Sequence, residues 1–134
     1  MAMEKNFDVK KIIETKKAPV AIGPYSQAVL TGNLIFCSGQ IGVNPKTNII
    51  AKGIKAQTQQ ALKNLRVVLA SANSSLDCVV KVDVFLKNID DFNAMNETYA
   101  NFFHSDPPAR QTVEVSALPR NANIEISCIA YSKK

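Results

Sequence analysis

Histidine is almost absent from this chain of 134 residues, since His104 is the only one. The three cysteines, Cys37, Cys78 and Cys128, are odd in number and far apart in the sequence. Zinc sites and activated nucleophiles need histidine and cysteine in groups or pairs. The sequence therefore predicts no metal site and no cofactor, and it predicts buried free cysteines in a reducing compartment.

Long apolar segments are missing too. No run approaches the roughly 20 apolar residues that cross a membrane. The N-terminus lacks the apolar core of a signal peptide, and its acidic residues argue against a transit peptide. We therefore expect a cytoplasmic protein that does not span a membrane.

The body of the chain has no excess of charge of one sign. The formal net charge is +5, but residues 1–17 and the last two lysines carry most of it. Between residues 18 and 132, nine basic side chains stand against eight acidic ones. Nucleic-acid-binding proteins usually concentrate basic residues on one face, so nucleic acid is not an expected partner.

Hydrophobic periodicity predicts an α+β domain. Apolar residues recur at helical spacing in residues 54–72 and 92–103. Strand-like segments with turn residues between them occupy 9–14, 26–30, 34–40, 78–86, 109–116 and 124–131. This order predicts a single mixed β-sheet with two helices packed on one face.

The other face of this sheet would then be uncovered. Strict alternation puts Val80 on the helix-covered face of its strand. It puts charged residues on the uncovered face together with Val79, Phe85, Ile129 and Tyr131. Because monomers rarely expose so much apolar surface in one patch, we expect an oligomer that packs these faces together.

Two charged residues stand out within the predicted strands. Arg110 follows two prolines at a strand start, where a guanidinium can bind a carboxylate with two hydrogen bonds, although a structural salt bridge is an alternative. Glu125 lies in an otherwise apolar strand. A carboxylate there needs either an ion-pair partner, such as Arg120 or Arg110, or a role in handling water.

Three further residues are candidates for a ligand site, and each of them could instead have a purely structural role. Asn96 lies on the apolar side of the second helix, as a buried structural amide or as a polar group for a ligand. Tyr25 follows the tight turn Gly23-Pro24 and is a core, surface or site residue. Gly39 ends a strand, where glycine permits close approach of a ligand or of another strand.

Taken together, four segments resemble the RidA (YjgF-like) family. They are APVAIGPYSQA at 18–28, SGQIGVNPKT at 38–47, DFNAMNETY at 91–99 and PARQTVEVSALPRNANIEI at 108–126. The resemblance spans residues 18–132. It implies one chorismate-mutase-like domain, with residues 1–17 as an extension and first strand before a RidA-like part at 18–134. It also implies a homotrimer with a cleft at each subunit interface.

The activity implied by the resemblance is hydrolysis of reactive 2-imino acids to 2-keto acids and ammonia. Such imines arise when pyridoxal-phosphate enzymes dehydrate serine or threonine. By matching position, Arg110 would bind the substrate carboxylate and Glu125 would orient or activate the attacking water. Other residues would line or complete the cleft: Tyr25, Asn96, and the backbone of Gly39 and Thr112.

Some positions depart from the family pattern. Gln111 stands where many members have a small residue, Thr112 where cysteine is frequent, and Ser127 where a second glutamate is common. The sequence leaves two other functions open, a ribonuclease or translation inhibitor and a non-catalytic ligand-binding trimer. It also leaves open the preferred imino acid and the role of the N-terminal extension.

Overall fold

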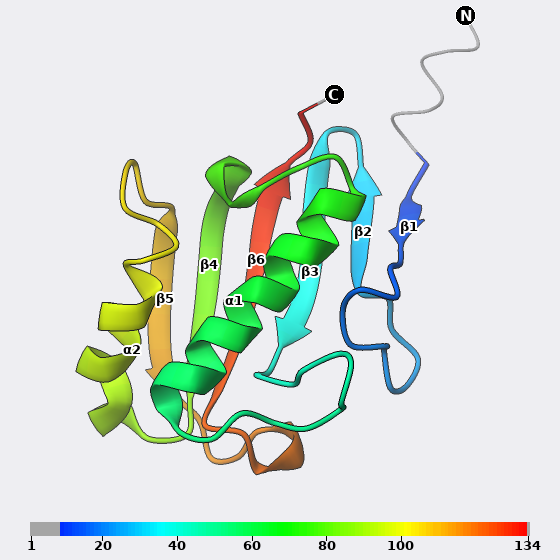
Figure 1. Ribbon diagram of the computed structural model, residues 1–134. Coiled ribbons are helices and arrows are strands. Elements are labelled where there is room, and N and C mark those ends of the chain that lie inside the picture. Colours follow the sequence, from blue (N-terminus) through cyan, green and yellow to red (C-terminus); the bar gives the residue numbers. More distant parts are fainter. Residues whose placement is uncertain (1–8, 134) are drawn as a thin grey trace, which may run out of the picture.

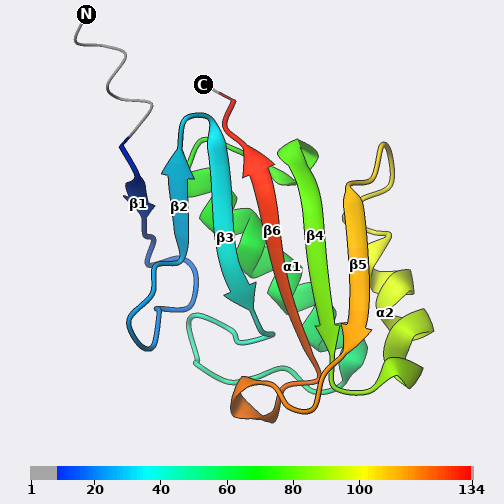
Figure 2. The ribbon, with the colours of Figure 1, turned by 180° about the vertical axis from the view of Figure 1, so that it is seen from behind.

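A computed structural model describes residues 9–133 of the chain; residues 1–8, the first part of the predicted extension, and residue 134 lie outside the described residues. Six strands form one mixed sheet, and two helices lie on one of its faces (Figures 1 and 2). The predicted α+β architecture is confirmed. The main elements are β1 (Lys11–Ile13), β2 (Ala28–Thr31), β3 (Leu34–Gln40), α1 (Ile54–Ser71), β4 (Val79–Leu86), α2 (Phe92–Tyr99), β5 (Ala109–Glu114) and β6 (Ile124–Tyr131).

The sheet has the strand order β1-β2-β3-β6-β4-β5. Neighbouring strands are antiparallel except β4 and β5, which are parallel and are joined through α2. The hairpin between β2 and β3 turns at Gly32, whose φ of +59° suits glycine. The last strand, β6, lies between β3 and β4, so Glu125 is brought into the middle of the sheet.

The core lies between the sheet and α1. The apolar stripe predicted for this helix is buried, with Leu62 and Leu69 fully enclosed. Val84 and Ile126 meet it from the sheet. All three cysteines are free and buried, as expected. Neither helix of the described chain is long and apolar enough to cross a membrane.

The faces predicted for β4 are wrong at its start. The register with β6 shifts between Val79 and Lys81. Val79 is 6% exposed and Val80 is 46% exposed, which reverses the strict alternation. A β-bulge inserts one extra residue and so exchanges the faces of the residues before it. From Val82 onward the predicted faces are correct.

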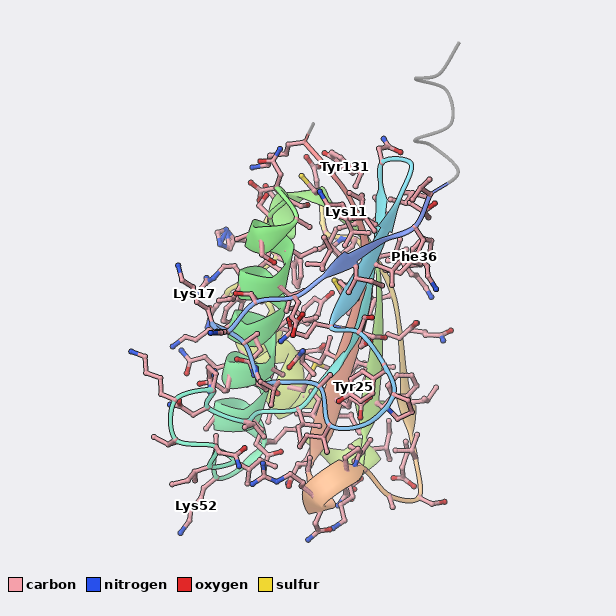
Figure 3. The ribbon with its side chains drawn as sticks, turned by 90° about the vertical axis from the view of Figure 1, so that its right-hand side faces the viewer. Lys11, Lys17, Tyr25, Phe36, Lys52 and Tyr131 are labelled. Carbon is pink, nitrogen blue, oxygen red and sulfur yellow. The ribbon has the colours of Figure 1, made fainter. Side chains whose placement is uncertain are left out.

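The sheet face opposite the helices is open. Phe36, Val113 and Tyr131, from three different strands, each keep 42% of their surface exposed. Figure 3 shows Phe36 on the side of the sheet away from α1. Half-buried Phe85 and Ile129 lie between them on β4 and β6. We call this apolar surface the open face.

A buried amide ties α1 to the loop before β6. Gln57 is 4% exposed; its Nε2 donates to Asn123 Oδ1 at 3.2 Å, and its Oε1 accepts from the Asn123 backbone N–H at 2.7 Å. Truncation of Gln57 would leave both Asn123 groups without these partners. Losing partners in this way typically costs about 1–3 kcal/mol.

We therefore predict that Gln57→Ala lowers the free energy of unfolding by about 1–3 kcal/mol in denaturant titrations at one fixed protein concentration. The control is Gln59→Ala, an exposed position of the same helix, which should change it by less than about 0.5 kcal/mol. Equal effects of the two substitutions would contradict this role of Gln57.

Candidate active site

A cavity of about 750 Å³ lies beside the end of β3 and the start of β6. Small-molecule sites typically have volumes of roughly 300–1,000 Å³. Three of the predicted site residues, Tyr25, Gly39 and Glu125, line this cavity. The segment between β1 and β2 contributes apolar wall residues, among them Val20 and Ile22. The fold therefore joins parts of the chain that are 100 residues apart in sequence.

Glu125 is the carboxyl group of this cavity. It forms neither an ion pair nor a hydrogen bond with any residue of the described range, so the pairing with Arg120 or Arg110 that was one interpretation is not formed. Burial raises the pKa of the Glu125 carboxyl above its ordinary value. A carboxyl group with a raised pKa exchanges protons more readily near neutral pH.

Gly39 makes room for Glu125. A β-carbon at position 39 would overlap the Glu125 carboxylate. The absence of a side chain therefore lets the carboxylate lie directly against the backbone of β3. Close approach of another strand's side chain, one of the two interpretations of Gly39, is what the structure shows.

The start of β6 is held by contacts from three directions. Arg120 donates from Nη1 to Asn48 Oδ1 at 3.1 Å and from Nη2 to the Asn48 carbonyl at 3.0 Å. Lys87 at the end of β4 donates to the Asn121 side chain. Together with the Gln57–Asn123 pair, these contacts fix the short turn η4 (Pro119–Asn121) and the entry of β6, and so they fix Glu125.

Arg110 lies on the other face of the sheet, beneath α2. Its guanidinium carbon is 4.6 Å from the centre of the Tyr99 ring and 5.7 Å from that of Phe92. Its Nη1 lies 4.0 Å from the sulfur of Met95. No acidic side chain of the described chain is within ion-pair distance, so the salt-bridge interpretation is wrong. Among the described residues, Arg110 is therefore a positioned cation without an anionic partner.

Two buried hydroxyl groups accompany Arg110. Thr112 points to the same side of β5 two residues later, and its Oγ1 has no hydrogen-bond partner in the described part of the chain. The same is true of the Tyr99 hydroxyl, whose pKa burial raises although Arg110 acts in the opposite direction. Asn96, on α2, is partly buried and does not line the Glu125 cavity.

One chain does not bring Arg110 and Glu125 together. Arg110 is paired with Val82, which faces the helices, whereas Glu125 is paired with Phe85 on the open face. The two residues are two strands and three register positions apart. With strands about 4.8 Å apart and about 3.3 Å per residue, their Cα atoms are separated by roughly 14 Å.

Several contacts around the predicted site residues could not be predicted from the sequence. The rings of Phe92 and Tyr99 belong to a predicted apolar stripe, but nothing in the sequence places Arg110 beneath them. The contact between Arg120 and Asn48 joins residues 72 positions apart. Among residues 9–133, no three histidine, cysteine, aspartate or glutamate side chains gather as metal ligands would.

Comparisons with known proteins all point to one group of proteins. The family model described as Endoribonuclease L-PSP matches residues 15–132. The human 2-iminobutanoate/2-iminopropanoate deaminase is 45% identical over 123 residues, which cover 91% of this chain and 90% of that protein.

Two crystal structures are similar over almost their whole length. RidA from the Antarctic bacterium Psychrobacter sp. PAMC 21119 has a TM-score of 0.88 and 41% identity, covering 90% of this chain and 98% of that one. E. coli TdcF with bound serine has a TM-score of 0.88 and 39% identity, covering 92% and 99%.

The raised pKa of Glu125 predicts how stability depends on pH. Below the pKa of the carboxyl in the unfolded chain, about 4.3, both states are protonated and burial carries no penalty. Above it, burial disfavours the charged form, so the folded state loses stability as pH rises through the higher folded pKa. We predict that Glu125→Gln gains Tm relative to the unsubstituted protein between about pH 4 and pH 8.

Glu97→Gln provides a control of opposite sign. The hydrogen bond from Lys55 lowers the pKa of Glu97, so removal of that carboxylate should reduce relative stability as pH rises. If Glu125→Gln followed the same trend as Glu97→Gln, the Glu125 carboxylate would have a stabilising partner, contrary to the structure.

Proposed function

Because the chain belongs to the RidA (YjgF-like) family, we propose that it is a deaminase that hydrolyses 2-imino acids to 2-keto acids and ammonia. The observation that carries this proposal is the pair of uncompensated groups, the Arg110 cation and the Glu125 carboxyl. A 2-imino acid offers a carboxylate for the first and needs a positioned water for the second. The name of the human relative and the serine bound by TdcF, an amino acid of related size and charge, support this substrate class.

In this proposal Arg110 binds the substrate carboxylate. The aromatic rings beside the guanidinium restrict its orientation without neutralising its charge. A planar guanidinium donates two parallel hydrogen bonds to a carboxylate, which fixes both the position and the direction of the substrate. The backbone at Thr112, on the same strand, completes this contact. Asn96 lies on the helix that covers Arg110, and we place it near the bound substrate.

Glu125 acts on water. Its carboxylate accepts a proton from a water molecule as the water oxygen forms a bond to C2 of the imine. The carboxyl group then returns this proton to the nitrogen as the C=N double bond opens, which leaves a hydroxyl and an amino group on C2. The hydroxyl proton next moves through the carboxylate to the amino group, the C2–N bond breaks as the C2–O double bond forms, and ammonia leaves while the 2-keto acid remains. A raised pKa suits a group that must both take and give a proton. Tyr25 and the backbone of Gly39 line this part of the site.

We further propose that Arg110 of one subunit and Glu125 of another meet at each interface of a homotrimer. Arg110 and Glu125 of one chain lie on opposite faces of its sheet, so a shared substrate requires two copies. The open face supplies an apolar surface that solvent would disfavour, and packing three open faces together would cover Phe36, Val113 and Tyr131. Each interface would then hold one site.

We predict that Arg110→Ala lowers kcat/KM for 2-iminopropanoate by roughly 30- to 1000-fold, because it removes a charge-assisted pair. Arg110→Lys should recover only part of the activity, since an ammonium group cannot donate two parallel hydrogen bonds as the planar guanidinium does. Glu125→Gln should cost ~10²–10⁴-fold in kcat. The measurement is keto-acid release above the spontaneous rate, from imines made in situ by an amino-acid oxidase.

Arg66→Ala is the matched control. Its guanidinium also lies over an aromatic ring, that of Phe102 at 5.6 Å, but on the helix layer away from the proposed site. It should keep activity within about twofold. A folded Arg110→Ala protein as active as Arg66→Ala would refute the assigned site. RNA cleavage without imine hydrolysis would favour a ribonuclease, and ligand binding without either would favour a binding protein.

A further inference from the structure

Arg120 is a cation at the Glu125 cavity, and the proposed chemistry does not use it. Arg120 lines the cavity together with Gly39 and Glu125. Both of its hydrogen bonds go to neutral oxygen atoms of Asn48, at 3.1 and 3.0 Å. No acidic group in the described part of the chain forms an ion pair with it. Because a guanidinium has five N–H donors, most of its hydrogen-bonding capacity stays available.

The backbone around Arg120 is strained in a way that keeps this cation in place. Asn48, Arg120 and Asn121 have φ values of 60°, 55° and 57°, which are uncommon for residues other than glycine. Such strain persists only where surrounding contacts enforce it, and it is frequent at ligand sites. Here the enforcing contacts are those of Lys87 and Gln57 to the same loop. The guanidinium is therefore pre-organised.

The cavity also offers the space and charge for an anionic group. Lys16 adds a second positive charge to its wall, and Glu125 is the one acidic side chain among the described residues that line it. Burial raises the pKa of the Glu125 carboxyl, and within the described chain no ion pair joins it to Arg120. The smallest 2-imino acids would occupy only a small part of about 750 Å³. Space remains for a longer substrate that reaches Arg120.

Building on the proposed deaminase function, we propose that Arg120 forms a subsite for a second carboxylate, so that the protein accepts 2-imino acids with acidic side chains. The substrate class comprises the imines of aspartate and glutamate, 2-iminosuccinate and 2-iminoglutarate. Arg110 holds the carboxylate next to C2, and Arg120 holds the one on the side chain. The reaction is unchanged: water adds its oxygen to C2, the C–N bond breaks, ammonia leaves, and the distal carboxylate takes no part.

The test compares kcat/KM for 2-iminosuccinate, made in situ by an aspartate oxidase, with kcat/KM for 2-iminopropanoate. The unsubstituted protein should accelerate both hydrolyses. Arg120→Gln should lower the value for 2-iminosuccinate at least about tenfold more than that for 2-iminopropanoate, because a charge-assisted hydrogen bond is lost. Arg120→Lys, which keeps the charge, should retain more of the preference than Arg120→Gln.

Lys63→Gln is the control, because it removes the same charge from the exposed side of α1. It should leave the ratio of the two kcat/KM values unchanged. Equal losses on both substrates in Arg120→Gln would mean that Arg120 only supports the loop, and this would overturn the subsite. So would a protein that hydrolyses 2-iminopropanoate but not 2-iminosuccinate, while the proposed function would stand. If neither imine is hydrolysed faster than in buffer, the proposed function fails and the subsite fails with it.

Discussion

Side chains alternate between the two faces of a β-strand, and this alternation separates the two charged residues on which the proposed chemistry depends. Arg110 shares its face with Val82 under the helices, and Glu125 shares the opposite face with Phe85. No rotation of either side chain can move it through a sheet whose centre is fully packed. The site that we propose uses both groups, so it would be made from two copies, and the apolar open face is the surface through which we propose that these copies pack.

Among residues 9–133, no ion pair compensates either charge. Arg110 is offset only by contact with aromatic rings, and such contacts are worth about 0.5–1 kcal/mol at partly exposed sites. Glu125 has no ion-pair partner in the part of the chain that the structure describes, and burial raises its pKa. Proteins usually pair charges within strands, because burying them unpaired is unfavourable. A substrate that brings its own carboxylate and a water molecule would satisfy both groups at once.

Most of the architecture follows from the sequence, because local patterns determine it. The helical spacing from Ile54 onward and the turn at Gly32 depend on neighbouring residues alone. The faces of Val79 and Val80 could not be predicted, because a bulge depends on how β4 pairs with β6 and leaves no mark in the alternation itself. The parallel pairing of β4 with β5 is likewise a tertiary property.

The residues of the candidate site could also be predicted from the sequence, but their surroundings could not. Arg110 and Glu125 stand out in the sequence as charges in strands, and Gly39 as a glycine at a strand end. Their environments do not, because each is built from residues far away in the chain. The ring of Tyr99 reaches Arg110 only once α2 packs on β5. Asn48 and Arg120 both have positive φ values, which residues other than glycine seldom adopt. The contact between them therefore could not be predicted from a sequence pattern.

The most direct test of the account is to mix two inactive variants, Arg110→Ala and Glu125→Gln, and to let their subunits exchange by refolding them together. If every site takes Arg110 from one copy and Glu125 from another, a random equal mixture gives about a quarter of its interfaces both intact residues. The account predicts recovery of about a quarter of the unsubstituted imine-hydrolysis rate. Mixed oligomers, verified by mass spectrometry, that are no more active than either variant alone would contradict it.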